Sequence, residues 1–372
     1  VLFLFTINTY NYIILRMFVI HPIIQKKKNQ RLLIAGPCGA ESEEQVFATA
    51  AALHQQGNID LFRCGIWKPR SSPKSFEGVG ENALIWLQEI QKKYQIQSCI
   101  EIVSPQHLEI ALRYNITHFW IGARTTVNPF LVQGIADAAA GTDISIMIKN
   151  PIAPDINLWI GAFERFAKLG ITKMAAIHRG FLTSETGVYR NNPLWKIPIE
   201  LKRLHPEIPI FCDPSHIAGD KKYIYEIAQK ALFLGTDGLM IEVHQTPENS
   251  LSDKNQQLTP NEFAQLIHSL NISTATNTQD TLLQQYREII DELDKEICLI
   301  LSKRFEAVKQ IANYKKEKNI SLSQIDRWKQ VMENIYKECE NKHIDISFMK
   351  KIMELLHEES IRIQENITKE KI

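Results

Sequence analysis

The distribution of glycine and proline divides this 372-residue chain into two parts. All 16 glycines and all 15 prolines lie at or before Pro260, and the residues after it contain neither. These two residue types end helices and form turns between strands, so a segment that lacks both can stay helical throughout. The sequence therefore predicts a first part rich in turns and a second part made of helices alone.

Short apolar runs alternate with amphipathic segments throughout the first part. The runs with the length and composition of strands are residues 31–38, 61–67, 98–103, 118–123, 145–150, 173–179, 209–213 and 238–244. A helical pattern follows each run, as at residues 43–55 and 158–169. Repeats of strand and helix predict an α/β fold, a closed (β/α)8 TIM barrel, with an open doubly wound sheet as the alternative.

Polar and charged side chains recur near the expected carboxyl ends of these strands. The positions are Cys38, Lys68, Glu101, Arg124, Lys149, His178 with Arg179, Asp213 with His216, and Glu242 with His244. A closed barrel gathers its strand ends into one ring, whereas an open sheet spreads them along a line. The ring favours the barrel and predicts an active site inside it.

Four residues in or near this ring are potential metal ligands: Cys38, His216, Glu242 and Asp253. A thiolate, an imidazole and two carboxylates suit one divalent ion such as manganese, iron, cobalt or zinc better than magnesium, which prefers oxygen ligands. For Cys38 taken alone, a buried small apolar residue is the alternative.

Five cations share the same rim: Lys68, Arg70, Arg124, Lys149 and Arg179. They would repel one another unless anions lay between them, and the planar guanidinium of arginine binds both phosphate and carboxylate. We therefore expect a phosphorylated substrate. Because Schiff-base aldolases also place a lysine at a barrel strand end, Lys149 keeps that mechanism open as an alternative.

Six ordered motifs now identify a family resemblance. They are Ile34-Ala-Gly-Pro-Cys38, Lys68-Pro-Arg-Ser71, Ile121-Gly-Ala-Arg124, His178-Arg-Gly180, Asp213-Pro-Ser-His216 and Ile241-Glu-Val-His244. Residues 31–270 resemble the 3-deoxy-D-arabino-heptulosonate 7-phosphate (DAHP) synthases, the first enzymes of the shikimate pathway of aromatic amino acid biosynthesis. Related octulosonate 8-phosphate synthases share the scaffold and remain an alternative. The Lys-Pro-Arg-Ser run resembles the heptulosonate enzymes' Lys-Pro-Arg-Thr, and Ser71 keeps the hydroxyl group.

The resemblance implies a role for each matching position. The metal ligands would be Cys38, His216, Glu242 and Asp253. Phosphoenolpyruvate would bind Arg124, Lys149 and Arg179, and erythrose 4-phosphate would bind Lys68, Arg70, Ser71 and Asp213. The metal would act as a Lewis acid on the aldehyde oxygen, and Lys149 would serve as a general acid as well as a carboxylate ligand.

The second part begins after a polar segment without periodicity, residues 271–279, which we interpret as a linker. Helices are expected at residues 280–318, 324–341 and 346–367. Alternating steps of three and four along the first helix place Arg287, Arg304 and Lys315 on its apolar face. A buried cation without a partner is unfavourable, so either acidic side chains or a bound dianion must neutralise these three.

Residues 280–367 resemble the all-helical chorismate mutases, whose three-helix chains form an intertwined dimer. Six residues fall on that family's binding positions: Arg287, Arg304, Lys315, Arg327, Ser360 and Gln364. Of these, the resemblance gives catalytic roles to Arg304, Lys315 and Gln364 in the rearrangement of chorismate to prephenate. The counterpart of Arg287 enters the other protomer's pocket, so a homo-oligomer, at least a dimer, is implied.

Two positions of the helical part depart from the mutase pattern. Gln324 and Trp328 stand where acidic side chains often contact the substrate. The helical domain, residues 280–372, therefore has two interpretations. It is a working mutase, or it is a non-catalytic module that senses chorismate or prephenate and inhibits the barrel by feedback.

Composition and the N-terminal residues bear on location. A net charge of +1 gives no indication of a nucleic-acid partner, and six cysteines without paired spacing favour a reducing, cytoplasmic compartment. The apolar first twenty residues fit neither a signal peptide nor a membrane-spanning helix, because Arg16 and a polar stretch interrupt them. We expect translation to begin at Met17 and residues 1–30 to be a leader outside the fold, with no membrane association.

Overall fold

The computed structural model describes residues 18–24, 31–57, 59–70, 72, 74–184, 187–270, 281–318 and 325–369. Four sequence expectations fall wholly or partly outside these ranges: Ser71, Gln324, the linker, and most of residues 1–30. The chain divides into two compact units, Val1–Thr274 and Ala275–Ile372.

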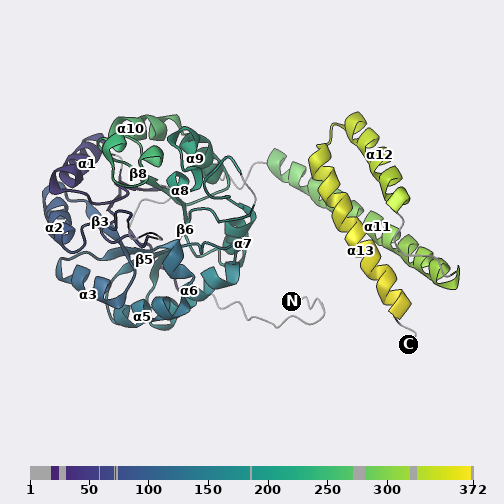
Figure 1. Ribbon diagram of the computed structural model, residues 1–372, viewed down its shortest axis with the longest axis horizontal. Helices are drawn as coiled ribbons and strands as arrows, with labels where there is room; N and C mark the ends of the chain where they lie inside the picture. The colour runs from purple at the N-terminus through teal and green to yellow at the C-terminus, as the bar shows by residue number, and fades with distance from the viewer. Residues whose placement is uncertain are drawn as a thin grey trace. The chain divides into compact units, whose positions relative to one another are not determined.

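The first unit is a closed parallel barrel whose strands follow one another in chain order (Figure 1). The strands are β1 (Leu32–Gly36), β2 (Leu61–Arg63), β3 (Gln97–Ile102), β4 (His118–Ile121), β5 (Ser145–Lys149), β6 (Lys173–His178), β7 (Ile210–Cys212) and β8 (Gly238–Glu242). Strand β8 closes the barrel on β1, with Gly238 opposite Leu32 and Glu242 opposite Gly36. The predicted barrel is confirmed, and the open doubly wound sheet is excluded.

Helices surround the strands (Figure 1). They are α1 (Glu43–Gln56), α2 (Asn82–Tyr94), α3 (Pro105–Arg113), α4 (Ala123–Thr126), α5 (Pro129–Ala139), α6 (Ile156–Lys168), α7 (Lys196–Leu204), α8 (Pro214–Ala218), α9 (Ile224–Phe233) and α10 (Pro260–Ser269). Short 3-10 turns occur at η1 (Lys221–Tyr223), η2 (Pro247–Asn249) and η3 (Lys254–Gln256). Side-chain caps define several helix starts: Ser42 accepts a hydrogen bond at α1, and Thr259 forms a capping box with Glu262 at α10.

The barrel has two apolar layers, because each parallel strand is buried on both faces. One layer lies between strands and helices and includes Phe62, Phe119 and Trp159. The other fills the barrel interior, with Trp120 and Met147 among its buried members. This double burial explains why the strands read as nearly continuous apolar runs in the sequence.

Residues 18–24 pack against the amino-terminal end of the barrel. Ile23 is buried and joins the interior apolar layer. The Phe18 amide donates a hydrogen bond to Glu207 over 2.9 Å, and the His21 amide donates one to the Thr172 carbonyl. The expectation that residues 1–30 lie outside the fold is therefore wrong for this segment, because its apolar side chains pack on the amino-terminal end of the barrel.

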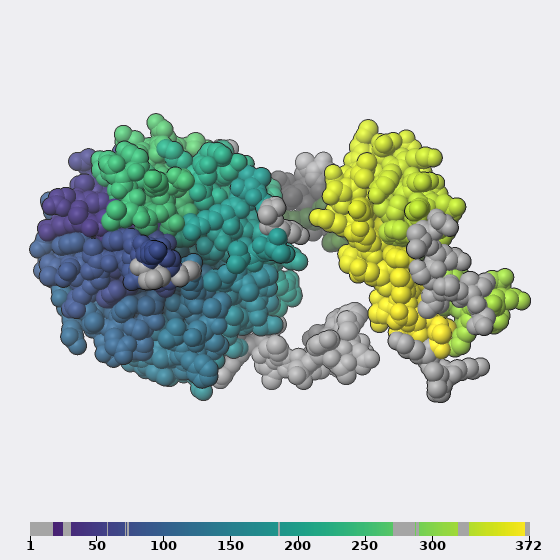
Figure 2. All heavy atoms as spheres, viewed as in Figure 1, coloured from purple at the N-terminus to yellow at the C-terminus, as the bar shows by residue number. Residues whose placement is uncertain are grey.

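The second unit consists of α11 (Thr281–Lys318), α12 (Ile325–Lys342) and α13 (Ile346–Lys369). Helices α11 and α12 each pack against α13 (Figures 1 and 2). Buried side chains between them include Val308, Ala312, Met332 and Met353. The three helices agree closely with the predicted ranges. None of the helices in the described parts of the chain is both long and apolar enough to cross a membrane.

Candidate active site

A pocket opens at the carboxyl-terminal end of the barrel, where this fold places its variable loops. Its lining comes from the ends of β2 through β8: Lys68, Pro69, Arg70, Glu101, Gly122, Ala123, Arg124, Lys149, Arg179, His216 and Asp253. All five cations predicted for the rim belong to this lining. His178 and His244, which the sequence placed in the same ring, are buried and do not line the pocket.

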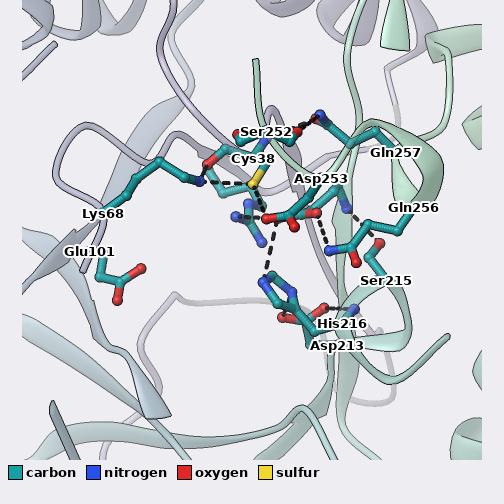
Figure 3. Close-up of polar contacts among 12 residues, drawn as sticks. Cys38, Lys68, Glu101, Asp213, Ser215, His216, Ser252, Asp253, Gln256 and Gln257 are labelled. Atoms are coloured by element: carbon teal, nitrogen blue, oxygen red, sulfur yellow. Dashed lines mark hydrogen bonds and ion pairs between the residues drawn. The ribbon is translucent and has the colours of Figure 1, made fainter. Parts of the chain in front are cut away.

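The four predicted metal ligands lie in two close pairs. The Cys38 sulfur is 3.2 Å from Asp253 Oδ2, and His216 Nε2 is 3.7 Å from Glu242 Oε1. Figure 3 shows the Cys38 thiol beside the Asp253 carboxylate, with His216 nearby. Within the described ranges, no group of three or more His, Cys, Asp or Glu side chains converges closely enough to hold a metal ion. The donor atoms nevertheless match a borderline divalent ion in type, and the two pairs are neighbours at one end of the barrel.

Cys38 is held as a neutral thiol in this arrangement. Burial and the neighbouring Glu242 carboxylate raise its pKa to about 12, against the opposing charge of Lys68. The Lys68 ammonium lies 2.8 Å from the sulfur and donates a second hydrogen bond, over 2.7 Å, to the Cys38 carbonyl. Lys68 therefore links the loop after β2 to the loop after β1 (Figure 3).

Glu242 has a buried cationic partner that the sequence interpretation missed. Arg63, the last residue of β2, lies 3.0 Å from Glu242 Oε1 and 5.0 Å from the centre of the Trp120 ring. Burial alone would raise the pKa of Glu242, but the charges of His216 and Arg63 lower it overall. The available signal was a charged residue within an otherwise apolar strand, since a buried arginine needs a partner.

Asp213 lies between two other residues of the site. Its Oδ2 atom is 2.8 Å from Lys149 Nζ and 2.8 Å from His216 Nδ1, while Oδ1 accepts a hydrogen bond from the His216 amide. That last contact is an N-cap of α8, and Pro214 follows at the favoured first position. Although burial opposes ionisation, His216 and Lys149 hold the pKa of Asp213 well below its usual range. Asp213 has no exposed surface, and both of its carboxylate oxygens contact neighbouring residues of the site.

Two arginines bracket Asp253, which adopts a left-handed backbone conformation with φ of 50°. Arg190 Nη1 lies 2.8 Å from Asp253 Oδ1, and Arg70 Nη1 lies 3.3 Å from Oδ2. The opposing effect of burial is outweighed by His216 and Arg190, which lower the pKa of Asp253. Arg190 lies in the loop after β6 and had no distinguishing signal in the sequence.

Two asparagines hold Arg179, one through its side chain and one through its backbone. Its Nη1 atom donates to the Asn191 side chain over 2.8 Å, and its amide donates to Asn150 Oδ1 over 2.7 Å. Burial lowers the pKa of Arg179 to about 10, and the charge of Arg190 acts in the same direction. Arg179 therefore carries a poorly solvated cation that an anionic ligand would stabilise.

In the helical unit, three of the six predicted mutase residues are in contact. Arg304 Nη1 donates to the Ser360 hydroxyl over 2.8 Å, and Gln364 Nε2 donates to the Ser360 carbonyl over 3.1 Å. Ser360 and Gln364 are buried, and burial lowers the pKa of Arg304. Lys315 is half-buried, and the remaining two, Arg287 and Arg327, are exposed.

Trp328, the departure from the mutase pattern within the described residues, has a defined partner. Its ring packs on His357 of α13 with 4.4 Å between ring centres and 33° between ring planes. His357 lies one turn before Ser360, so both occupy neighbouring positions on one face of α13. An indole and an imidazole therefore border the Arg304 and Ser360 cluster.

Comparison with known proteins gives a family for each unit. Residues 14–278 match the model of the DAHP synthetase I family, and residues 286–365 match chorismate mutase type II. A phospho-2-dehydro-3-deoxyheptonate aldolase of Thermotoga maritima is 32% identical over 238 residues, which cover 64% of this chain and 68% of that protein. A 2-dehydro-3-deoxyphosphooctonate aldolase of Helicobacter acinonychis is 24% identical and is covered over 96% of its length, against 66% of this chain.

Solved structures give the same assignment. The crystal structure of the Thermotoga maritima DAHP synthase superposes with a TM-score of 0.58 at 30% identity, covering 64% of this chain and 68% of that one. A truncated form of the Thermotoga maritima enzyme gives a TM-score of 0.56 at 26% identity, covering 71% and 87%. The chain therefore belongs to the DAHP synthetase I family and is a bifunctional enzyme in which a DAHP synthase barrel precedes a type II chorismate mutase domain.

Proposed function

We propose that the barrel pocket is the DAHP synthase site, where its cations hold phosphoenolpyruvate and erythrose 4-phosphate beside one divalent metal ion. The observation that carries this proposal is the convergence of five cations, from the ends of β2, β4, β5 and β6, on one pocket. Asp213 and Asp253 pair with Lys149 and Arg70, and a cluster of this size favours further anions. Each of the two substrates carries a phosphate group.

Phosphoenolpyruvate is assigned to Arg124, Lys149 and Arg179. Lys149 is only 4% exposed, and it lines the pocket from the carboxyl-terminal end of β5. The Arg179 guanidinium is held by Asn191, and its backbone amide is held by Asn150.

Erythrose 4-phosphate is assigned to the loop after β2, through Lys68 and Arg70. Both line the same pocket as Lys149. The assignment of Ser71 to this substrate rests on the sequence motif alone. Asp213 is assigned to this substrate by the sequence motif, and its position between Lys149 and His216 supports a second role in orienting them.

Cys38, His216, Glu242 and Asp253 would hold a manganese, iron, cobalt or zinc ion. When bound, such an ion polarises the aldehyde carbonyl. Lys149 holds a proton at Nζ and is positioned to deliver it to an oxygen that gains negative charge. The Asp213 carboxylate gives the ammonium form of Lys149 an ion-pair partner, whereas a Schiff-base mechanism needs the free amine.

Phosphate release tests the barrel assignment directly. Purified protein is supplied with phosphoenolpyruvate and either erythrose 4-phosphate or arabinose 5-phosphate, before and after treatment with a chelator. We expect preference for erythrose 4-phosphate, loss of activity with the chelator and recovery with Mn²⁺. Preference for arabinose 5-phosphate would reverse the substrate assignment, and borohydride trapping of substrate on Lys149 would reverse the mechanism.

The helical unit is assigned the mutase reaction, with Arg304, Lys315 and Gln364 acting on chorismate and Ser360 binding it. Arg327 and a second copy's Arg287 would complete the pocket. Chorismate rearranges without proton transfer, so cations that face its carboxylates and ether oxygen supply the catalysis. Binding of prephenate without rearrangement of chorismate would instead favour the sensing module.

An exposed apolar stripe on α11 supports a dimer through the helical unit. It consists of Ile290, Leu293, Ile297 and Ile300, each between 52% and 61% exposed. These residues recur at helical spacing on one face, and a second copy of the same helix is the occupant that the mutase resemblance implies.

Prephenate or chorismate is proposed as the feedback inhibitor of the barrel. The proposal is supported by the fusion of the two units in one chain, and it requires that ligand bound to one unit change the other's affinity. Repeating the phosphate-release assay with added prephenate tests it. A cytoplasmic location is supported by the six cysteines, all among the described residues and all free.

A further inference from the structure

Two adjacent glutamines, at the end of η3 in the loop after β8, contact the proposed metal ligands Cys38 and Glu242. Gln256 is 1% exposed and Gln257 is fully buried. Their side-chain amides make hydrogen bonds with different partners, and the substrate assignments above use neither residue. Buried amides whose oxygen and nitrogen both make hydrogen bonds fix the structure around them, because an unmatched partner would be costly.

Gln257 joins the loop after β1 to the loop after β8. Its Oε1 atom accepts a hydrogen bond from the Cys38 amide over 2.9 Å, and its Nε2 atom donates to the Ser252 carbonyl over 2.9 Å and the Ser250 hydroxyl over 2.8 Å. The orientation of this amide is dictated by its partners, since a backbone N–H can only donate and a carbonyl can only accept. Gln257 therefore fixes where the Cys38 backbone lies relative to the segment that carries Asp253 (Figure 3).

Gln256 contacts the Glu242 carboxylate directly and the Asp253 carboxylate through Arg190. Its Nε2 atom donates to Glu242 Oε2 over 2.7 Å, and its Oε1 atom accepts from Arg190 Nη1 over 2.8 Å. The same Arg190 nitrogen donates to Asp253 Oδ1 over 2.8 Å. Again the partners dictate the orientation, because a carboxylate only accepts and a guanidinium only donates.

We infer that Gln256 and Gln257 are positioning residues that hold Cys38, Glu242 and, through Arg190, Asp253 in place for the metal ion. The inference rests on the proposed metal ligands. An amide is suited to this role because it combines a donor nitrogen and an acceptor oxygen in one plane without adding charge. Glutamate at position 256 would face the Glu242 carboxylate, and methionine would fill the space without making either hydrogen bond.

The test uses the full-length protein and two single variants, Gln256→Met and Gln257→Met. Competition with a chromogenic chelator measures the Kd for Mn²⁺, which we expect to rise about 10- to 100-fold in each variant. Thermal unfolding with and without Mn²⁺ separates positioning from a purely structural role. Loss of packing lowers both Tm values together, whereas weaker binding shrinks the increase in Tm that Mn²⁺ produces.

Gln55→Met is the matched control, since Gln55 is exposed on α1 and should leave the Mn²⁺ affinity unchanged. Gln256→Glu provides a second variant if the methionine variant fails to fold. It keeps an acceptor for Arg190, removes the donor to Glu242 and should weaken Mn²⁺ binding as well.

If the variants that fold, at both positions, bind Mn²⁺ with the same Kd as the wild type, the inference is overturned. Cys38→Ser distinguishes this from failure of the ligand assignment. If the wild type binds Mn²⁺ and Cys38→Ser does not, the ligand assignment stands and the glutamine variants decide the inference. If the wild type does not bind Mn²⁺, or Cys38→Ser binds it equally well, the ligand assignment fails and the inference with it.

Discussion

The Lys149 ammonium nitrogen lies 2.8 Å from Asp213 Oδ2, and neither side chain is more than 5% exposed. The same carboxylate oxygen lies 2.8 Å from His216 Nδ1. One buried carboxylate therefore orients both the lysine assigned to phosphoenolpyruvate and the imidazole assigned to the metal. Such shared positioning makes the two assignments depend on each other.

Replacement of Lys149 by methionine should lower kcat/KM for DAHP formation by about 10²- to 10⁴-fold, the range typical of a lost general acid. The side chain keeps its length but loses the proton donor and the charge that faces the substrate. Phosphate release at saturating erythrose 4-phosphate measures the effect.

Lys168→Met is the control for that substitution, because Lys168 is exposed at the end of α6. It should retain wild-type kcat/KM. Activity of Lys149→Met within tenfold of wild type would remove Lys149 from the chemical step and leave it a role in binding alone.

The strands were predictable because burial on both faces makes each one an apolar run that ends where the polar loop begins. Lys149 and Glu242 illustrate this, since each is the last residue of its strand and each faces the site. Predicted strands such as residues 61–67 were too long. After the Cys64 amide, which still donates to the Cys99 carbonyl of β3, the buried residues continue as a loop. Sequence hydrophobicity does not distinguish a buried loop from a buried strand.

The contacts that bind the site together were not predictable. Arg190 and Asp253 are far apart in the sequence, as are Arg63 and Glu242, and their pairing depends on how the barrel brings the loops together. Gln257 gave no signal because a glutamine in a polar loop is ordinarily exposed. Sequence motifs indicated which residue types the chemistry needs, whereas the partners that orient them depend on tertiary packing.

His178 should make the barrel less stable in mild acid. It is fully buried beside the rings of Phe181 and Trp195, and burial lowers its pKa to about 3. At pH values between this pKa and the pKa of about 6.5 in the unfolded chain, His178 is protonated in the unfolded chain and neutral in the native protein. The free energy of unfolding should therefore decrease as pH falls through this window, by about 1.4 kcal/mol per pH unit from His178.

Urea unfolding between pH 7 and pH 5, followed by tryptophan fluorescence, measures this slope. His178→Phe should reduce the slope, whatever its effect on stability at pH 7. His268→Phe is the control, since His268 is exposed on α10. Equal slopes for wild type and His178→Phe would show that other groups account for the acid sensitivity.

Arg304→Met should lower kcat/KM for chorismate by about 10²-fold or more, because an aligned cationic donor is lost from the pocket. Phosphate release by the barrel, without added effector, should stay within about twofold of wild type, since Arg304 lies in the other compact unit. The two assays on one preparation distinguish a local effect from general misfolding.

Arg362→Met is the matched substitution on the helical unit. Arg362 pairs with Glu359 at the surface of α13, over 2.6 Å, and both are well exposed compared with Ser360. Exposed ion pairs contribute little, so this variant should keep mutase activity. Equal loss in the two variants would indicate damage to the helical fold rather than to the pocket.

Ile297→Glu should separate the proposed dimer. Ile297 is 54% exposed at the centre of the apolar stripe on α11, and burial of such a side chain contributes roughly 1.5 to 3 kcal/mol. A carboxylate there would also have to lose its hydration against an apolar partner. Sedimentation velocity should show a dimer for the wild type and a monomer for the variant at the same concentration.

Gln310→Glu adds the same charge to an exposed position of α11 and should remain a dimer, which isolates the effect of the apolar stripe. Mutase activity should fall with dissociation, because Arg287 is assigned to the pocket of the partner copy. Full mutase activity in a monomeric Ile297→Glu variant would contradict that shared pocket, since a pocket built by one copy alone would not depend on association.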